Sequence, residues 1–385
     1  MTKSIIQEHS AKIKATLPKG DVNAKMEVFY NPVMVSNRNI SILLINNIKN
    51  KNMNLALPLT GSGIRALRFL QELKKNKLNY LFVNDKKTNF PEIFQENIVL
   101  NKLTNSNLIN KIKICATDAN LFLLNQTNYS ESEDKDKTFC GYFDYIDIDP
   151  FGTPNPFLAS SISRICRDGI LAVTATDTAA LTGTYPKVTK RKYWAKSLKN
   201  YLMHETGLRI LIRKVQLQGI QFDKSLTPIL SYHKDHYFRI YFKCTKGKQK
   251  CDDLIKQHQY LLYCHKCLSF KPSNYNSSNC DCKNKFDYAG PLWSGKLFDK
   301  KLIAKMVKDN EKHNLFPEEQ KFLNTLMGES KFDLFGYYDL HEIARKFKTN
   351  IPKQESITNK VKCSRTHFSP NGLKCKHDIV KLLTK

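Results

Sequence analysis

Short apolar runs alternate with segments of helical period along the first 243 or so residues. The runs have the length and the Ile, Leu, Val and aromatic content of buried β-strands, and they cover residues 54–59, 80–83, 112–115, 143–148, 169–176 and 237–242. Between the early runs, residues 64–74 and 90–103 carry apolar side chains at steps of three and four, as amphipathic helices do. Strands that alternate with helices predict an α/β fold with a parallel, doubly wound sheet. Residues 125–137 are polar, charged and without apolar period, which predicts a surface loop.

The composition changes after residue 244. Residues 245–250 are typical of a linker or an exposed turn, a cysteine-rich stretch extends to Cys282, and helical period returns from Lys301. Residues 361–385 form a basic segment. Because 385 residues exceed what one compact core usually holds, we predict two domains, 1–244 and 245–385, the second smaller and of α+β type.

The charge of the chain indicates its kind of partner. Lys and Arg number 62 against 35 Asp and Glu, a formal net charge of +27, which favours a polyphosphate such as a nucleic acid. No apolar run has the length of a membrane span, and the first residues resemble neither a signal peptide nor a transit peptide. We therefore expect an intracellular, cytoplasmic protein. Residues 361–385, with Arg191, Lys192 and Lys196, are the candidate phosphate contacts.

Three successive strand ends carry residues suited to a nucleoside cofactor. A Thr60-Gly-Ser-Gly turn follows the first strand and opens a helix, where small residues allow the close approach of a ligand. Asp85 ends the second strand and is placed for ribose hydroxyls, and Asp118, followed by Ala119, ends the third, beside a candidate adenine position. Considered alone, the Thr60-Gly-Ser-Gly sequence is equally typical of an ordinary tight turn, and Asp85 is equally typical of a helix N-cap.

The fourth strand ends in Asp149-Pro150-Phe151, a string similar to the motif by which amino-methyltransferases bind an exocyclic amine. Such an amine is a poor nucleophile because its lone pair is delocalised into the ring. Asp149 and the Pro150 carbonyl can accept its two N–H bonds, and Asp149 can take the proton as a methyl group arrives. Phe151 can stack on a base that has left its helix. The alternative is an Asp-Pro turn that only ends the strand.

Two pairs of cysteines have the spacing of a metal site. Cys264 and Cys267 precede Cys280 and Cys282 by twelve residues, and four thiolates at this separation can bind a structural Zn²⁺ in tetrahedral geometry. The alternatives are free thiols, or a site in which His265 replaces one cysteine. Cys244, Cys251, Cys363 and Cys375 have no close partner in the sequence and are expected to be single packed thiols.

Several long strings resemble the tRNA (guanine-N2-)dimethyltransferase family over nearly the whole chain. They include residues 28–34 with Asn37-Arg38, 62–65, 147–154, 174–179, 183–186 with 191–193, 205–209, 235–239, 289–293 and 364–372. The resemblance implies an S-adenosylmethionine-dependent methyltransferase domain of Rossmann-like fold that modifies the N2 of guanine 26 in tRNA. It also implies a catalytic acid at Asp149, flanked by Phe29 and Phe151. The cofactor contacts that it implies are Arg38, Arg65, Asp85, Asp118 and Ala119.

Two positions depart from the resemblance: Leu57 and Asn39 stand where many relatives carry acids. The leading hypothesis is a tRNA guanine-N2 methyltransferase that binds S-adenosylmethionine and structural zinc. One alternative is an amino-methyltransferase for another RNA guanine or a DNA adenine. The other is a non-catalytic RNA-binding protein with a zinc ribbon, which leaves Asp149-Pro150-Phe151 unexplained.

Overall fold

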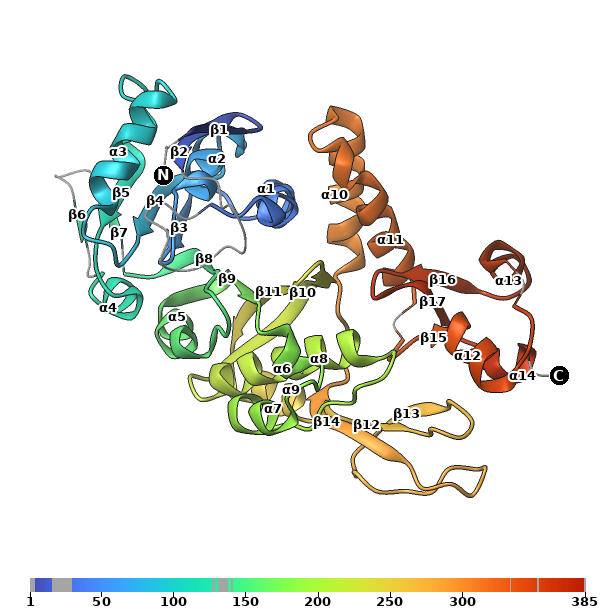
Figure 1. Cartoon of the computed structure of the whole chain (residues 1–385). Coiled ribbons are helices and arrows are strands. Elements are labelled where there is room, and N and C mark those ends of the chain that lie inside the picture. Colours follow the sequence, from blue (N-terminus) through green and yellow to red (C-terminus); the bar gives the residue numbers. More distant parts are fainter. Residues whose placement is uncertain are drawn as a thin grey trace. The chain divides into compact units, whose positions relative to one another are not determined.

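A computed structural model of the chain (Figure 1) describes residues 4–15, 30–126, 129–130, 138–139, 141–332, 334–351 and 353–383. Contacts between Cα atoms group the chain into two compact units. Unit 1 comprises Met1–Thr174 and Lys243–Thr245, and unit 2 comprises Ala175–Phe242 and Lys246–Lys385. Compactness does not show which segments fold on their own, so the domain boundary after residue 244 stays a prediction.

Unit 1 is built on five parallel strands, β3 (Met53–Leu57), β4 (Leu78–Asn84), β5 (Ile112–Cys115), β8 (Phe143–Ile148) and β9 (Ile165–Ala175). These strands lie in the order β5-β4-β3-β8-β9, so successive strands are added on one side of β3 and then, from β8, on its other side. The helices of this unit are α1 (Val35–Asn47), α2 (Ile64–Glu72), α3 (Phe90–Leu100), α4 (Ala119–Leu124) and α5 (Leu158–Arg164). The prediction of an α/β fold with a parallel sheet is confirmed.

Burial explains why these runs form strands. The apolar side chains of β3 and β8 are buried, as expected where helices cover a parallel sheet. The turn between β3 and α2 needs glycine at position 63, where φ is +84° and an added Cβ would lie 2.5 Å from the ring of Phe94. This close approach brings the start of α2 against α3.

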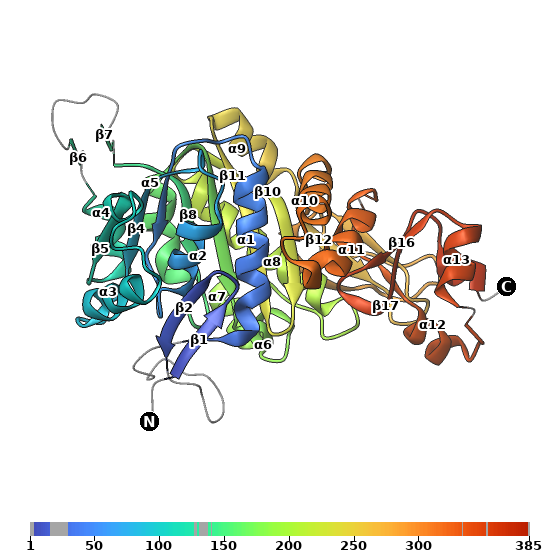
Figure 2. The same cartoon turned by 90° about the horizontal axis from the view of Figure 1, so that it is seen from above.

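The sequence did not predict an N-terminal hairpin, β1 (Ser4–Glu8) and β2 (Ala11–Ala15), which Figure 2 shows beside α2. Ser10 donates from its hydroxyl to Glu72 on α2 at 2.6 Å, and the Lys14 amide donates to Asn97 on α3 at 2.9 Å. Two further short strands, β6 (Tyr129–Ser130) and β7 (Thr138–Phe139), pair with each other. The rest of the predicted loop, apart from residues 125–126, lies outside the described residues.

Unit 2 has mixed α and β structure. It begins with α6 (Thr178–Leu181), α7 (Pro186–Tyr193), α8 (Met203–Ile220), β10 (Lys224–Lys234), β11 (Tyr237–Lys246) and α9 (Lys248–Ile255). The predicted strand at 237–242 lies in β11, and residues 245–250 turn at Gly247 directly into α9. In the described part of the chain, short helical turns of the 3-10 type are Pro32–Met34, Ile109–Lys111, Asn155–Phe157 and Pro317–Glu319.

Two three-stranded sheets and five helices complete unit 2. One sheet joins β13 (Phe270–Ser273), β12 (His258–Tyr263) and β14 (Asp287–Trp293), and the other joins β15 (Tyr338–Asp339), β17 (Ser369–Cys375) and β16 (Cys363–Thr366). The helices are α10 (Lys300–His313), α11 (Gln320–Ser330), α12 (Leu340–Phe347), α13 (Gln354–Lys360) and α14 (Ile379–Leu383). Of the helices in the described part of the chain, none is both long enough and apolar enough to cross a membrane.

The basic segment contains residues that are buried in unit 2 as well as exposed ones. Lys374 on β17 is 2% exposed, and its Nζ lies 2.9 Å from Glu205 Oε2 and 3.6 Å from Glu329 Oε1. His367 Nδ1 lies 2.7 Å from Glu329 Oε2. The expectation that this segment offers its charges to a phosphate partner is therefore wrong for Lys374, whose ammonium group faces two internal carboxylates.

Cys363 and Cys375 correct a second expectation, since they are joined in a disulfide. The two residues lie directly opposite each other in the antiparallel pairing of β16 with β17, with Cα atoms 4.3 Å apart. This pairing depends on strand register, which cysteine spacing alone does not reveal. Cys244 and Cys251 are buried thiols, as predicted.

Candidate active site

The carboxyl ends of β3, β4 and β5 meet at one edge of the sheet of unit 1. The side-chain amide of Asn84, at the end of β4, donates to the carbonyl of Pro58 and to that of Thr117, both at 3.0 Å. The Gly61 amide donates to Asp85 Oδ2 at 3.0 Å. Ligands of doubly wound sheets bind at this edge, where the strand order reverses. The glycine turn and Asp85 thus come together as predicted.

Asp85 and Asp118 have different local roles. Asp85 accepts hydrogen bonds from the amides of Gly61 and Lys87, whereas the N-cap of α3 is Asn89. The helix-cap explanation of Asp85 is therefore wrong. Asp118 does cap α4, because its Oδ1 accepts from the amides of Asn120 and Leu121 at 2.9 and 3.2 Å. Asp118 is exposed, and Ala119, the first residue of α4, is buried.

Arg65 joins α1, α2 and the end of β8. Its guanidinium donates from Nη2 to Asp149 Oδ2 and, at 3.0 Å, to Asn37 Oδ1. Its Nη1 lies 3.1 Å from the hydroxyl of Ser41 and 3.3 Å from Asp147 Oδ2. The Arg65 side chain is 8% exposed and the Asp149 side chain 18%. The catalytic candidate is consequently held in one orientation by a nearly buried cation.

Pro150 and Phe151 follow Asp149 at the end of β8. Pro150 is buried, while the ring of Phe151 is 50% exposed. Phe151 is thus half-exposed, and its stacking on a base stays a prediction. Phe29, the other ring that the family resemblance indicates, lies outside the described residues.

Arg38 belongs to a second buried ion network. It donates from Nε to Glu8 Oε1 at 2.7 Å, and its Nη2 lies 2.5 Å from Glu8 Oε2. Arg68 contacts Glu8 at 2.8 Å and Glu72 at 2.7 Å, and the Tyr30 hydroxyl donates to Glu8 at 3.0 Å. Burial alone would raise the pKa of Glu8, but the two guanidinium groups outweigh burial and hold this pKa below its usual value.

Asp147 and Glu8 were not identified from the sequence as partners of these arginines, although the sequence carried a signal for Asp147. Asp147 lies on β8 and Asp149 directly follows it, and their spacing of two residues was visible in the sequence as a sign that both side chains lie on one side. Glu8 is 30 residues from Arg38 and 60 from Arg68 in the chain, and nothing local to its strand marks it as their partner.

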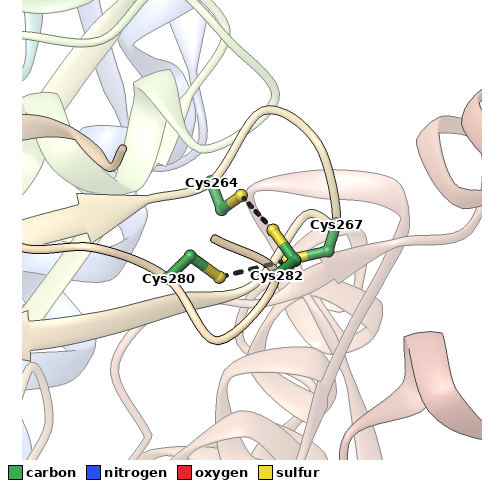
Figure 3. A group of neighbouring side chains, drawn as sticks. All are labelled: Cys264, Cys267, Cys280 and Cys282. Carbon is green, nitrogen blue, oxygen red and sulfur yellow. Dashed lines mark hydrogen bonds between the residues drawn. The ribbon is translucent and has the colours of Figure 1, made fainter. Parts of the chain in front are cut away.

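The four cysteines of the predicted metal site converge in unit 2 (Figure 3). Cys264 follows β12, Cys267 precedes β13, and the other pair lies before β14. The sulfurs of Cys264 and Cys282 are 3.5 Å apart, those of Cys267 and Cys280 are 3.4 Å apart, and all four lie within 4.8 Å of one another. His265 points elsewhere, with Nε2 3.2 Å from Asp287. The four thiols, without His265, therefore form the candidate site.

Of Arg191, Lys192 and Lys196, which were expected to contact phosphate, the two lysines are paired with acidic side chains of the same chain. Lys192 lies 3.3 Å from Asp177, and Lys196 lies 2.6 Å from Asp287. For Arg191, no ion pair occurs with any residue that the structure describes. Arg191 is therefore a better candidate for contact with a ligand than Lys192 or Lys196.

Comparison with known proteins agrees with this geometry. A sequence profile of the family "N2,N2-dimethylguanosine tRNA methyltransferase" matches residues 3–385. A tRNA (guanine(26)-N(2)/guanine(27)-N(2))-dimethyltransferase of Aquifex aeolicus is 36% identical, with 99% of this chain and 95% of that protein covered. A tRNA (guanine(26)-N(2))-dimethyltransferase of Methanobrevibacter smithii is 34% identical, with 98% and 95% covered.

Among solved structures, Trm1 from Pyrococcus horikoshii in complex with S-adenosyl-L-methionine superposes with a TM-score of 0.82. It is 31% identical, and the match covers 99% of this chain and 98% of the other. The resemblance found in the sequence is confirmed: the chain belongs to the N2,N2-dimethylguanosine tRNA methyltransferase family.

Proposed function

We propose that this protein transfers methyl groups, two in succession, from S-adenosylmethionine to the exocyclic N2 of guanine 26 in tRNA. The observation that carries the proposal is the arrangement at the end of β8, where Asp149 is held by Arg65 beside the half-exposed ring of Phe151. The curated relatives are named for this reaction, and one of them also for guanine 27.

In the proposed reaction, the residues of the β8 end prepare the amine. The Asp149 carboxylate and the Pro150 carbonyl accept the two N–H bonds, which directs the nitrogen lone pair toward the methyl donor. Asp149 then receives the proton that the nitrogen releases. Phe151 stacks on the extruded base, and we assign Phe29 to its other side. S-adenosylmethionine supplies an electrophilic methyl group when it is bound.

We place the cofactor at the carboxyl ends of β3, β4 and β5. The residues there fit a nucleoside: the Asp85 carboxylate suits ribose hydroxyls, and Asp118 and Ala119 border the adenine position. Arg38 and Arg65 are the candidate contacts of the methionyl carboxylate. Each guanidinium also faces an acid of this chain, Arg38 facing Glu8 and Arg65 facing Asp149. We therefore infer that Arg65 has a second role, which is to orient Asp149.

We propose that the four cysteines hold one structural Zn²⁺. Tetrahedral coordination with Zn–S bonds of about 2.3 Å places sulfurs roughly 3.8 Å apart, close to the separations observed here. Four protein ligands leave no position open for chemistry. We assign methyl transfer to residues 1–244 and tRNA binding to residues 245–385, assisted by basic residues of the first segment.

Nucleoside mass spectrometry tests the reaction. A tRNA transcript with guanine 26 is incubated with enzyme and labelled donor, then digested, and positions 26 and 27 are read separately. We expect N2-methylguanosine and then N2,N2-dimethylguanosine at position 26. Asp149→Asn should lose this product, while the Kd for tRNA stays within about twofold because affinity comes mainly from phosphate contacts.

Asp144→Asn is the matched control, since Asp144 lies on β8, the strand that Asp149 follows, and accepts from the Asn54 amide instead of facing Arg65. This variant should retain transfer. Wild-type activity in Asp149→Asn would contradict the role of Asp149. A wild-type protein that binds tRNA without methylating it would contradict the proposed function and favour a non-catalytic RNA-binding protein.

A further inference from the structure

After Pro186, every exposed residue of α7 is a cation. Thr189 and Tyr193, one turn apart, are buried, so the solvent-facing side of the helix presents Lys187, Lys190 and Arg191. These three residues form no ion pair with any residue that the structure describes. The sequence from residue 178 to 204 contains six Lys and Arg and no Asp or Glu. Two of the six, Lys192 and Lys196, pair with acids outside this stretch, whereas the three cations on the exposed side of α7 do not.

Two large rings border the same helix. Tyr185, immediately before α7, is 58% exposed, and Trp194, immediately after it, is 55% exposed. Lys214 Nζ lies 3.8 Å from the centroid of the Trp194 ring, which adds a cation beside that ring. We use the name α7 surface for Tyr185, Lys187, Lys190, Arg191 and Trp194.

Two simpler explanations cover only part of this surface. Basic residues in the last turn of a helix interact favourably with its dipole, which accounts for Lys190 and Arg191. Single exposed apolar side chains are common on any protein. Neither explanation accounts for two exposed rings at the two ends of a helix whose charged exposed residues are all cations.

We propose that the α7 surface binds the sugar–phosphate backbone of the tRNA substrate, with Tyr185 and Trp194 stacking against unpaired nucleotides. Cations interleaved with aromatic rings are the usual composition of surfaces that bind single-stranded or looped RNA. An anionic membrane is the less suitable partner, because the apolar side of α7 is buried and leaves no face to insert. The proposal rests on the proposed function, whose substrate it places on the protein.

The salt dependence of tRNA binding tests the electrostatic part. The variant Lys187→Gln/Lys190→Gln/Arg191→Gln should reduce the slope of log Kd against log[KCl] by about 2 to 3, because each phosphate that the protein neutralises adds about 0.7–0.9 to that slope. Its KM for tRNA should rise about tenfold or more, with kcat at saturating tRNA and the Kd for the donor unchanged. The charge-conserving variant Lys187→Arg/Lys190→Arg/Arg191→Lys should keep the wild-type slope.

Helix α10 supplies the matched control. Lys301, Lys305 and Lys308 are also exposed on one helix face, but Asp309 and Glu311 follow within the same helix. The variant Lys301→Gln/Lys305→Gln/Lys308→Gln should leave the slope and the KM near their wild-type values. Equal losses in both triple variants would overturn the proposal, because they would show a general effect of net charge.

Tyr185→Ala separates stacking from charge. It should raise the Kd for tRNA at least about fivefold without changing the salt slope. Melting temperatures confirm that each variant is folded. An α7 triple variant with the wild-type slope and KM would overturn the proposal, as would one that loses binding only to anionic vesicles. Because Kd is measured without methyl transfer, an inactive wild-type enzyme would contradict the proposed function alone.

Discussion

Replacing Arg65 by lysine tests whether its guanidinium positions Asp149 or serves only the methyl donor. Lysine keeps the charge but not the planar fork that reaches Asp149 and Asn37 from Nη2 and Ser41 from Nη1. A hydrogen bond to a charged group contributes about 1.5–3 kcal/mol. If that contribution keeps Asp149 in its reactive orientation, its loss lowers the rate roughly 10- to 100-fold.

The assay is single-turnover methyl transfer at saturating tRNA and saturating donor, with the Kd for the donor measured separately by calorimetry. We expect the rate of Arg65→Lys to fall by the stated factor. Arg68→Lys is the matched control: Arg68 lies on the same helix and is equally buried, but its partners are Glu8 and Glu72. This control should lower the melting temperature and leave the saturated rate unchanged.

The outcome that would refute the positioning role is specific. If Arg65→Lys transfers methyl groups at the wild-type rate once the donor is saturating, and only its Kd for the donor rises, the guanidinium serves the donor alone. The ion pair with Asp149 would then be a feature of the protein without donor, and Asp149 would be oriented by its backbone.

Three further predictions concern the cofactor, the cysteines and the response to acid. Asp85→Asn should raise the Kd for the donor about 10- to 100-fold through weakened ribose hydrogen bonds. An unchanged Kd in calorimetry would show that Asp85 only accepts the hydrogen bond from the Gly61 amide. Elemental analysis should find one zinc per chain, and a strong chelator should lower the melting temperature; metal-free protein straight from purification would contradict the site. Burial raises the pKa of Glu329, but His367 and Lys374 outweigh it and lower the pKa to about 2 from its ordinary 4.5. A lowered pKa stabilises the fold above pH 4.5, so about 3 kcal/mol should be lost as the pH falls from 4.5 toward 2. Urea unfolding checks this, and an identical pH dependence in Glu329→Gln would exclude Glu329 as its source.

Local signals explain why much of unit 1 was predictable. The strands are apolar runs bounded by polar residues. Asp85 and Asp149 follow their strands directly, and Asp118 follows β5 after two residues. The hairpin of β1 and β2 was missed, although the alternation of buried and exposed residues in β2 was a usable signal. The four cysteines that follow β12 and precede β14 were correctly expected to lie together.

Long-range pairing explains what could not be predicted. Arg65 and Asp149 are 84 residues apart, and which acid meets which arginine depends on the strand order of the folded sheet. The disulfide between Cys363 and Cys375 depends on the register of β16 with β17. In the segment 361–385, a count of positive charge does not separate buried Lys374 from exposed lysines such as Lys381, because both look alike in a sequence.

The burial of Lys374 bears on the synthesis of the chain. Glu205 on α8 leaves the ribosome 169 residues before its partner on β17, which at about 5–20 residues per second is a delay of roughly 10 to 30 s. During that time Arg209, one turn along α8, is the counter-ion within reach. A carboxylate without its full set of partners is costly to bury, so we expect the core around α8 to close after β17 has been made. Unit 2 is thus expected to mature after translation of β17, with the nascent α8 as a segment for chaperones to shield.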